Sequence, residues 1–121
     1  MTDLPRTPSF KLDGKRALVT GASRGVGLGG AMALAEQGAH VVMAARNAEE
    51  IGAAAQQVRD AGYSAEGISL DVGDYPAMVS TVRQHGPFDI LFNNAGTNQP
   101  MPYVDVTPEN FDMITDLNLK A

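Results

Sequence analysis

Three closely spaced glycines, placed between a short apolar run and an amphipathic run, constrain this sequence most. Arg16–Thr20 has the apolar middle expected of a strand, and Gly21, Gly25 and Gly27 follow it directly. Glycine tolerates positive φ and permits close backbone approach, while the start of a helix offers free N–H groups to an anion. The segment therefore predicts a strand, a pyrophosphate-binding turn and a helix. The alternative is that the glycines only turn the chain from strand to helix.

Short apolar runs and amphipathic runs continue to alternate after this turn. Three more short runs are predicted to be strands: His40–Ala45, Ala65–Leu70 and Ile90–Asn93. Such alternation, with right-handed crossovers, predicts an α/β fold of the Rossmann type, a doubly wound parallel sheet with strand order 3-2-1-4. We expect residues 1–10 to be a flexible tail and residues 11–121 to be an incomplete dinucleotide-binding domain of this kind.

Three helices are predicted between the strands, because apolar residues recur there at helical spacing. Asn47 and Asp74 are candidate N-caps, and Gly38, Gly62 and Gly86 are candidate terminators. The predicted apolar stripes are Leu28, Ala31, Met32 and Ala35 in the first helix; Ile51, Ala54, Ala55 and Val58 in the second; and Tyr75, Met78, Val79 and Val82 in the third.

A fourth helix is predicted to begin at Thr107-Pro108, where threonine can cap and proline suits the first helical position. Its apolar face would carry Phe111, Ile114, Asn118 and Ala121, and no C-cap follows. The fourth strand would also leave a bare apolar edge, which native proteins usually cover. We therefore expect the fold to be truncated, with further protein after Ala121.

Charge and composition narrow the classes of partner. The formal net charge is −5 and the nine Lys and Arg are scattered, so we expect neither nucleic acid nor a membrane as partner. There is no cysteine, which excludes disulfides and thiolate metal sites. His40 and His85 fit ordinary strand-edge and helix-end residues better than metal ligands. No signal-like start and no membrane-length apolar run is present, so a cytoplasmic location is expected.

Two motifs together give the chain a resemblance to a known family. Residues 20–27 read Thr-Gly-x-x-x-Gly-x-Gly, and Asn93-Asn94-Ala95-Gly96 follows the fourth predicted strand. Either motif alone could be a simple turn. In this order and context, they resemble the cofactor-binding motifs of the short-chain dehydrogenase/reductase family.

The resemblance implies a role for each matching position. The residues implied in cofactor binding are Gly21, Gly25 and Gly27 with the intervening Ser23, Arg24 and Val26; Thr20, which fixes the turn; Asp71 and Val72 against the adenine; and Asn93, Asn94, Ala95 and Gly96 along the adenine-ribose side. Asp71 could instead be a turn residue. Asn118 falls at the family's active-site asparagine, which helps to hold a water in the proton relay.

The choice of cofactor depends on the end of the second strand. An acidic residue there would bind the ribose 2′-hydroxyl of NAD, but the position is Ala45, followed by Arg46. Arg46 and Arg24 match a phosphate in charge and geometry, so the sequence favours NADP over NAD. The alternative is that both arginines are solvated surface residues.

The resemblance implies that the complete protein is an NADP(H)-dependent oxidoreductase interconverting a carbonyl and a secondary alcohol, of the oxoacyl-carrier-protein reductase or gluconate dehydrogenase type, and a homodimer or homotetramer. The family's catalytic Ser, Tyr and Lys are absent, since no Tyr-x-x-x-Lys occurs, so these 121 residues alone are expected to be inactive. Alternatives are a non-catalytic nucleotide-binding regulatory or scaffold protein, and a sugar-nucleotide epimerase or dehydratase, which the glycine spacing disfavours.

Overall fold

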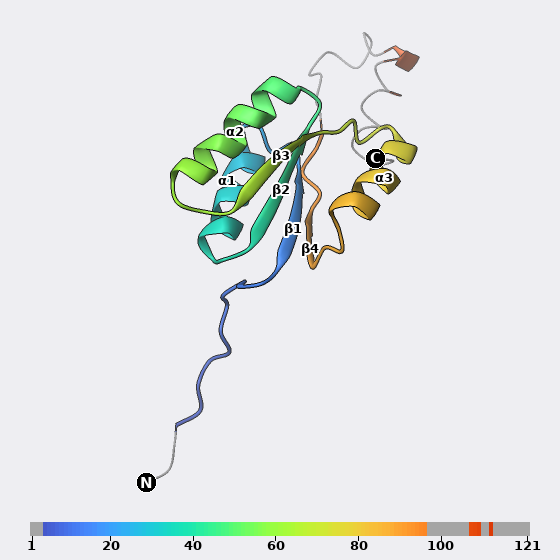
Figure 1. Cartoon of the computed structure of the whole chain (residues 1–121). Helices are drawn as coiled ribbons and strands as arrows, with labels where there is room; N and C mark the ends of the chain where they lie inside the picture. Colours follow the sequence, from blue (N-terminus) through green and yellow to red (C-terminus); the bar gives the residue numbers. More distant parts are fainter. Residues whose placement is uncertain (1–3, 97–106, 110–111, 113–121) are drawn as a thin grey trace.

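The computed structural model describes residues 4–96, 107–109 and 112. Its sheet has four parallel strands, β1 (Arg16–Thr20), β2 (His40–Ala45), β3 (Ala65–Ser69) and β4 (Ile90–Phe92), in the order β3-β2-β1-β4 (Figure 1). The predicted fold class and strand order are confirmed. The third and fourth strands end one residue earlier than predicted, which is within the usual uncertainty of element boundaries.

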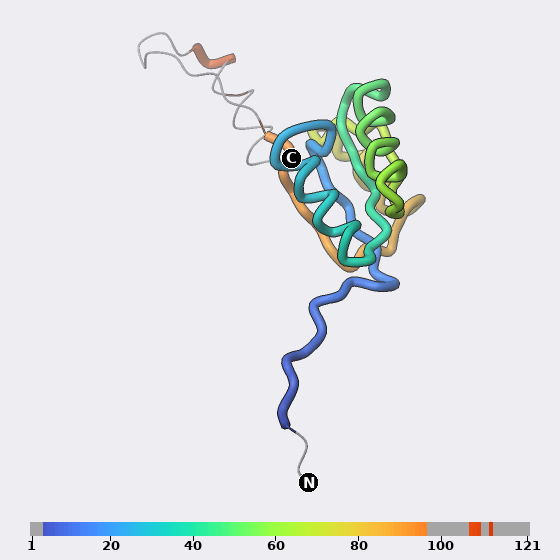
Figure 2. Tube along the Cα trace, turned by 90° about the vertical axis from the view of Figure 1, so that its left-hand side faces the viewer, coloured from blue at the N-terminus to red at the C-terminus, as the bar shows by residue number. Residues whose placement is uncertain are grey.

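Three helices cover the two faces of the sheet. They are α1 (Gly25–Glu36), α2 (Ala48–Asp60) and α3 (Tyr75–His85). The first two lie side by side on one face and α3 lies on the other (Figures 1 and 2). In the parallel register Thr20 is opposite Ala44, and Ala44 is opposite Ile68, so the carboxyl ends of these strands share one edge of the sheet. That edge is where ligands bind in open α/β sheets.

The helix α1 lies close to the sheet because its inner face is built from small residues. Ala31 and Ala35 are buried, and an added Cβ at Gly30 would overlap the Phe92 ring of β4. The larger Leu28 and Met32 of the predicted stripe are partly buried at the margin of the same core. The contact with the sheet is thus made mainly by glycine and alanine, with larger side chains flanking it.

The predicted apolar stripe of α2 is buried in full. Ile51, Ala54, Ala55 and Val58 are at most 2% exposed and join the core on this face of the sheet. The predicted cap is also present, since the Asn47 side chain accepts a hydrogen bond from the Glu50 N–H at 3.0 Å. Gly62 follows the helix with a φ of +96°, a conformation that favours glycine.

The apolar stripe predicted for α3 is only partly buried, and this prediction needs correction. Tyr75 is 76% exposed and Val82 48% exposed, whereas Thr81 is buried. Ala77 and Met78 pack against the small core around Leu18 and Val42. The side of α3 that faces the sheet therefore includes Ala77, Met78 and Thr81, and it is rotated away from Tyr75 and Val82. The predicted cap is confirmed, with Asp74 accepting from the Ala77 N–H at 3.1 Å.

The N-terminal segment, residues 4–11, is not part of this core. Residues 4–11 are exposed, have no regular secondary structure and extend away from the sheet (Figures 1 and 2). Of the predicted fourth helix, Pro108, Glu109 and Asp112 are helical, while its apolar face, including Asn118, lies outside the described residues. No helix among the described residues is long and apolar enough to cross a membrane.

Candidate functional site

A cavity of about 470 Å³ opens at the carboxyl edge of the sheet. The ends of all four strands, or the loops that follow them, contribute to its wall. Its lining residues are Gly21, Ser23 and Arg24 after β1; Ala44, Ala45, Arg46, Asn47 and Glu50 at the end of β2 and the start of α2; Leu70 and Val72 after β3; and Asn94, Ala95 and Gly96 after β4. The cavity is thus at the point where the strand order reverses, between β1 and β4.

The turn between β1 and α1 depends on glycine at three positions. Gly21 and Gly25 have φ values of +62° and +61°, in the left-handed region that disfavours other residues. Gly27 has ordinary φ, but an added Cβ there would overlap the Gly21 carbonyl oxygen. The start of α1 is therefore folded tightly onto the end of β1, which brings the helix N-terminus to the cavity.

The N-terminus of α1 differs from those of the other two helices. Its N-cap residue, Arg24, makes no side-chain capping hydrogen bond with the described residues. Asn47 and Asp74 cap α2 and α3 with their side chains. The first N–H groups of a helix need partners, and an anionic ligand is one way to supply them.

The Thr20 side chain joins the glycine turn to the loop after β4. This buried hydroxyl accepts hydrogen bonds from the backbone N–H groups of Asn94 and Ala95, both at 3.0 Å. It also donates to the Asn93 Oδ1 at 3.3 Å. The Asn94 Nδ2 in turn donates to the Gly21 carbonyl at 3.2 Å. The two sequence motifs are therefore in direct contact and hold each other in place.

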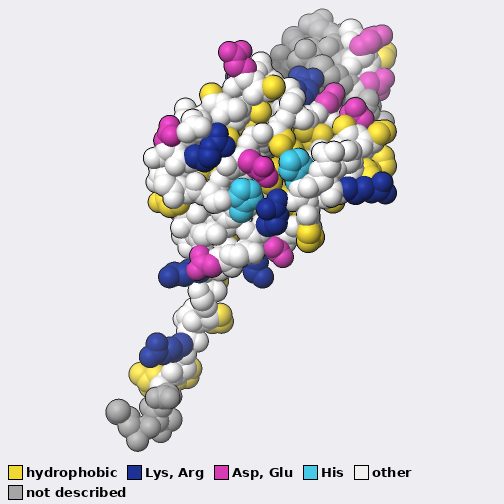
Figure 3. Space-filling view, viewed as in Figure 1, with side chains coloured by type: hydrophobic (Ala, Val, Ile, Leu, Met, Phe, Trp, Pro, Cys, Tyr) yellow, Lys and Arg dark blue, Asp and Glu magenta, His cyan; other side chains and the backbone are white. Residues whose placement is uncertain are grey.

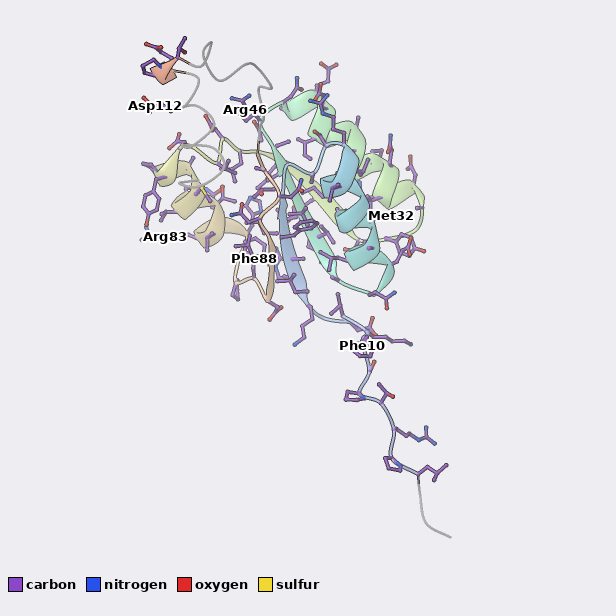
Figure 4. All side chains as sticks on the ribbon, turned by 180° about the vertical axis from the view of Figure 1, so that it is seen from behind. Phe10, Met32, Arg46, Arg83, Phe88 and Asp112 are labelled. Carbon is purple, nitrogen blue, oxygen red and sulfur yellow. The ribbon has the colours of Figure 1, made fainter. Side chains whose placement is uncertain are left out.

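Two arginines give the cavity its positive charge. Arg24 and Arg46 are exposed and line the cavity, and neither forms an ion pair or a side-chain hydrogen bond with the described residues. Figure 4 shows Arg46 at the end of β2, beside the start of α2. The Ser69 hydroxyl donates to the Arg46 carbonyl at 2.9 Å and so fixes the backbone of this turn. Both guanidinium groups are available to bind an anion.

The predicted site residues separate into those that line the cavity and those that support or flank it. Gly21, Ser23, Arg24, Arg46, Val72, Asn94, Ala95 and Gly96 line it, whereas Thr20, Gly25, Val26, Gly27, Asp71 and Asn93 do not. Asp71 forms a turn, with its Oδ1 accepting from the Gly73 N–H at 2.9 Å. Asn118 is outside the described residues. The roles proposed for these residues in cofactor binding stay predictions.

Sequence reasoning missed part of the wall. Ala44, Asn47, Glu50 and Leu70 line the cavity but were not predicted as site residues, and Ala45 was considered only as the missing acid. The sequence predicted Asn47 as a helix cap. It did not show that the first turn of α2 lines the same cavity as Arg46. The signal that could have found them is the parallel register, which places the end of β2 beside the end of β1, where the glycine turn begins, and the end of β3 beside β2.

A second polar cluster lies at the opposite edge of the sheet, where the strands begin. The Glu66 Oε1 is 3.3 Å from the His40 Nε2, 3.5 Å from the His85 Nδ1 and 3.8 Å from the Arg16 Nη2. Arg16 also donates from Nε to the His85 carbonyl at 3.0 Å, at the end of α3. Both histidines (cyan) lie on the face shown in Figure 3. They are the strand-edge and helix-end residues predicted from the sequence.

The surroundings of Glu66 change its titration. Partial burial raises the pKa of the Glu66 carboxyl, but the hydrogen bonds and charges of His40 and His85 outweigh it, so that the pKa lies below its ordinary value. No group of three or more His, Asp or Glu side chains within the described part of the chain is arranged to hold a metal ion. We interpret the cluster as a structural link between β1, β2, β3 and α3.

Comparison with known proteins gives matches over almost the whole chain. The family model described as short chain dehydrogenase matches residues 15–121. Gluconate 5-dehydrogenase of Gluconobacter oxydans is 41% identical over 116 residues, covering 93% of this chain and 45% of that protein. Versicolorin reductase 1 of Aspergillus parasiticus is 44% identical over 118 residues, with 93% and 45% covered. The chain thus spans less than half the length of these relatives.

Solved structures agree with the sequence matches. A putative short-chain alcohol dehydrogenase from Sinorhizobium meliloti superposes with a TM-score of 0.84 at 42% identity, covering 93% of this chain and 46% of that one. A gluconate 5-dehydrogenase from Burkholderia cenocepacia, solved in complex with NADP and tartrate, gives a TM-score of 0.81 at 38% identity, with 91% and 45% covered.

Proposed function

Because the chain belongs to the short-chain dehydrogenase family, we propose that the complete protein is an NADP(H)-dependent oxidoreductase that interconverts a carbonyl and a secondary alcohol. The family membership supports oxidoreductase chemistry. Of the two relatives named above, one is named a dehydrogenase and the other a reductase. The observation that carries the cofactor assignment is the pair of guanidinium groups at the cavity, Arg24 and Arg46, which have no partner among the described residues.

The cavity fits a dinucleotide phosphate in three respects. The N-terminus of α1 has no side-chain cap from Arg24 within the described part of the chain, and the glycines beside it have positive φ and no Cβ, so this turn suits a pyrophosphate. Leu70 and Val72 give part of the wall an apolar character suited to an adenine ring. Arg46 and Arg24 match the charge and shape of a 2′-phosphate.

In this mechanism the described residues bind and orient. Gly21, Gly25 and Gly27 shape the turn against the pyrophosphate, and Thr20 with Asn94 keeps that turn attached to the loop after β4. When bound, NADP(H) supplies or accepts the hydride exchanged with the carbonyl carbon. The proton at the carbonyl oxygen would be exchanged by the family's Ser and its Tyr-x-x-x-Lys pair, and these 121 residues contain no Tyr-x-x-x-Lys. Asn118 is proposed to help hold a water in that relay.

The remaining features of the complete protein also stay proposals. We expect a small carbonyl or alcohol substrate, a homo-oligomer and a cytoplasmic location. The alternative of a non-catalytic nucleotide-binding protein receives no support from the relatives named above, whose names are those of enzymes.

Enzyme assays on the full-length protein test the proposal. The substrates to try first are L-xylulose, for NADPH-dependent reduction, and gluconate, for NADP-dependent oxidation, because proteins named for these compounds are 36% and 41% identical to the chain. Each assay is repeated with the non-phosphorylated cofactor. Turnover that is faster with NADP(H) is expected. Binding of neither cofactor in a calorimetric titration would contradict the proposal.

A further inference from the structure

One carboxylate lies among the positive charges of the cavity. Glu50 lines the same cavity as Arg24 and Arg46, and its side chain makes no ion pair or hydrogen bond with the described residues. The three ionisable side chains in the lining therefore sum to a formal charge of +1 rather than +2. Arg46 lies in the turn before α2, four positions before Glu50 in the sequence.

The local backbone fixes where this carboxylate lies. Glu50 is the third residue of α2, and its N–H is held by the Asn47 side chain at 3.0 Å, which makes the first turn of the helix well defined. Glu49 belongs to the same turn but does not line the cavity. Adjacent residues in a helix point about 100° apart, which agrees with only one of these two neighbouring carboxylates lining the cavity.

The chemistry of a carboxylate distinguishes the two forms of the cofactor. A carboxylate accepts a hydrogen bond from a ribose 2′-hydroxyl, and it repels a 2′-phosphate in the same place. In many dinucleotide-binding folds the acidic residue that contacts this hydroxyl ends the second strand. That position is Ala45 here, so its side chain provides no carboxylate, while Glu50 provides one from the adjoining helix.

We propose that Glu50 is a specificity-determining residue, whose carboxylate accepts the ribose 2′-hydroxyl of NAD(H) and opposes the 2′-phosphate of NADP(H). Arg24 and Arg46 then favour binding of NADP(H), and Glu50 contributes to the affinity for NAD(H). This inference rests on the proposed function.

The test is calorimetric titration of NADPH and NADH into the full-length protein and its Glu50→Gln variant. Glutamine keeps the length of the side chain and suits a helix. We expect the variant to bind NADPH more tightly, by about 3-fold to 10-fold, because a nearby like charge is removed. We expect it to bind NADH more weakly, by about 2-fold to 10-fold, because a charge-assisted hydrogen bond becomes a neutral one.

The matched control is Glu49→Gln, which removes the same charge from the same helical turn outside the cavity. The control should leave the ratio of the two affinities unchanged. Shifts of both cofactors in the same direction in Glu50→Gln, or equal shifts in the two variants, would overturn the inference and leave the proposed function intact. If the wild-type protein binds neither nucleotide, the proposed function and the inference fall together.

Discussion

The two edges of the sheet hold their charged groups differently. At the edge where the strands begin, Glu66 lies within 4 Å of Arg16 and of both histidines. At the edge where the strands end, Arg24 and Arg46 have no partner within the described residues. The first arrangement satisfies its charges internally and links secondary structure elements. The second leaves them for a ligand, and the helix N-terminus beside it is also uncapped.

This contrast shows how a residue can be assigned to structure or to binding. Ionised groups that are already paired gain little interaction energy from a ligand. Unpaired cations beside a helix N-terminus with free N–H groups gain much more from an anion. We call the edge that holds Arg24 and Arg46 the open edge, and the edge that holds Glu66 the paired edge. Substitutions at the open edge should affect cofactor binding, whereas a substitution at the paired edge should affect only stability.

The largest effect is expected at the tightest point of the open edge. Gly27→Ala places a Cβ against the Gly21 carbonyl oxygen, so the turn must move away from its position. We expect loss of cofactor binding and a decrease of about 1–3 kcal/mol in the free energy of unfolding. The control is Gly29→Ala, two residues along the same helix, where a Cβ meets nothing within 4 Å. Comparable losses in both variants would show that the turn geometry is not the cause.

A smaller effect is expected at the support of that edge. Thr20→Val removes the hydroxyl that accepts from Asn94 and Ala95, and so leaves two backbone N–H groups without their acceptor. Because both N–H groups are only part-buried, water can replace part of the lost acceptor. We expect the free energy of unfolding to fall by about 1 kcal/mol, measured by urea unfolding of the full-length protein. Thr20→Ser retains the hydroxyl and should stay closer to wild type. If the serine variant is as unstable as the valine variant, the hydrogen bonds are not what stabilises the contact.

The smallest effect is expected at the paired edge. Because the folded-state pKa of Glu66 is lowered, its stabilisation is present above the ordinary value of 4.5 and is lost as the pH falls through the folded-state pKa. Glu66→Gln should therefore reduce the free energy of unfolding at about pH 6, by less than about 1 kcal/mol for partly exposed groups, and this difference should shrink at about pH 3.5. The control is Glu49→Gln, which removes a carboxylate from an exposed position. A difference that grows on acidification would contradict the pairing.

Much of the fold followed from local sequence signals. The strands are short apolar runs, Asn47 and Asp74 cap helices as their positions predicted, and the two motifs meet at the carboxyl edge. These features depend on a few neighbouring residues, so their physical cause is visible in the sequence. The order of the strands also followed, because right-handed crossovers leave few alternatives.

The features that escaped prediction depend on packing between distant segments. Thr81 is buried and Val82 is exposed, which depends on how α3 lies on the sheet. The contacts of Glu66 with His40 and His85 join three elements separated along the chain. Asn47 was recognised as a helix cap, but the position of Glu50 in the cavity wall requires knowing how α2 lies on the sheet.

The most direct test of the open edge is a pair of titrations with Arg46→Ala in the full-length protein. Removal of a charge-assisted contact with the 2′-phosphate should weaken NADPH by about 1.5–3 kcal/mol, or about 10-fold to 150-fold, while NADH changes little. Arg83→Ala, on the outer side of α3 (Figure 4), removes the same charge elsewhere and should alter neither affinity. Equal losses for NADPH and NADH in Arg46→Ala would contradict the assignment of this edge to a phosphorylated cofactor.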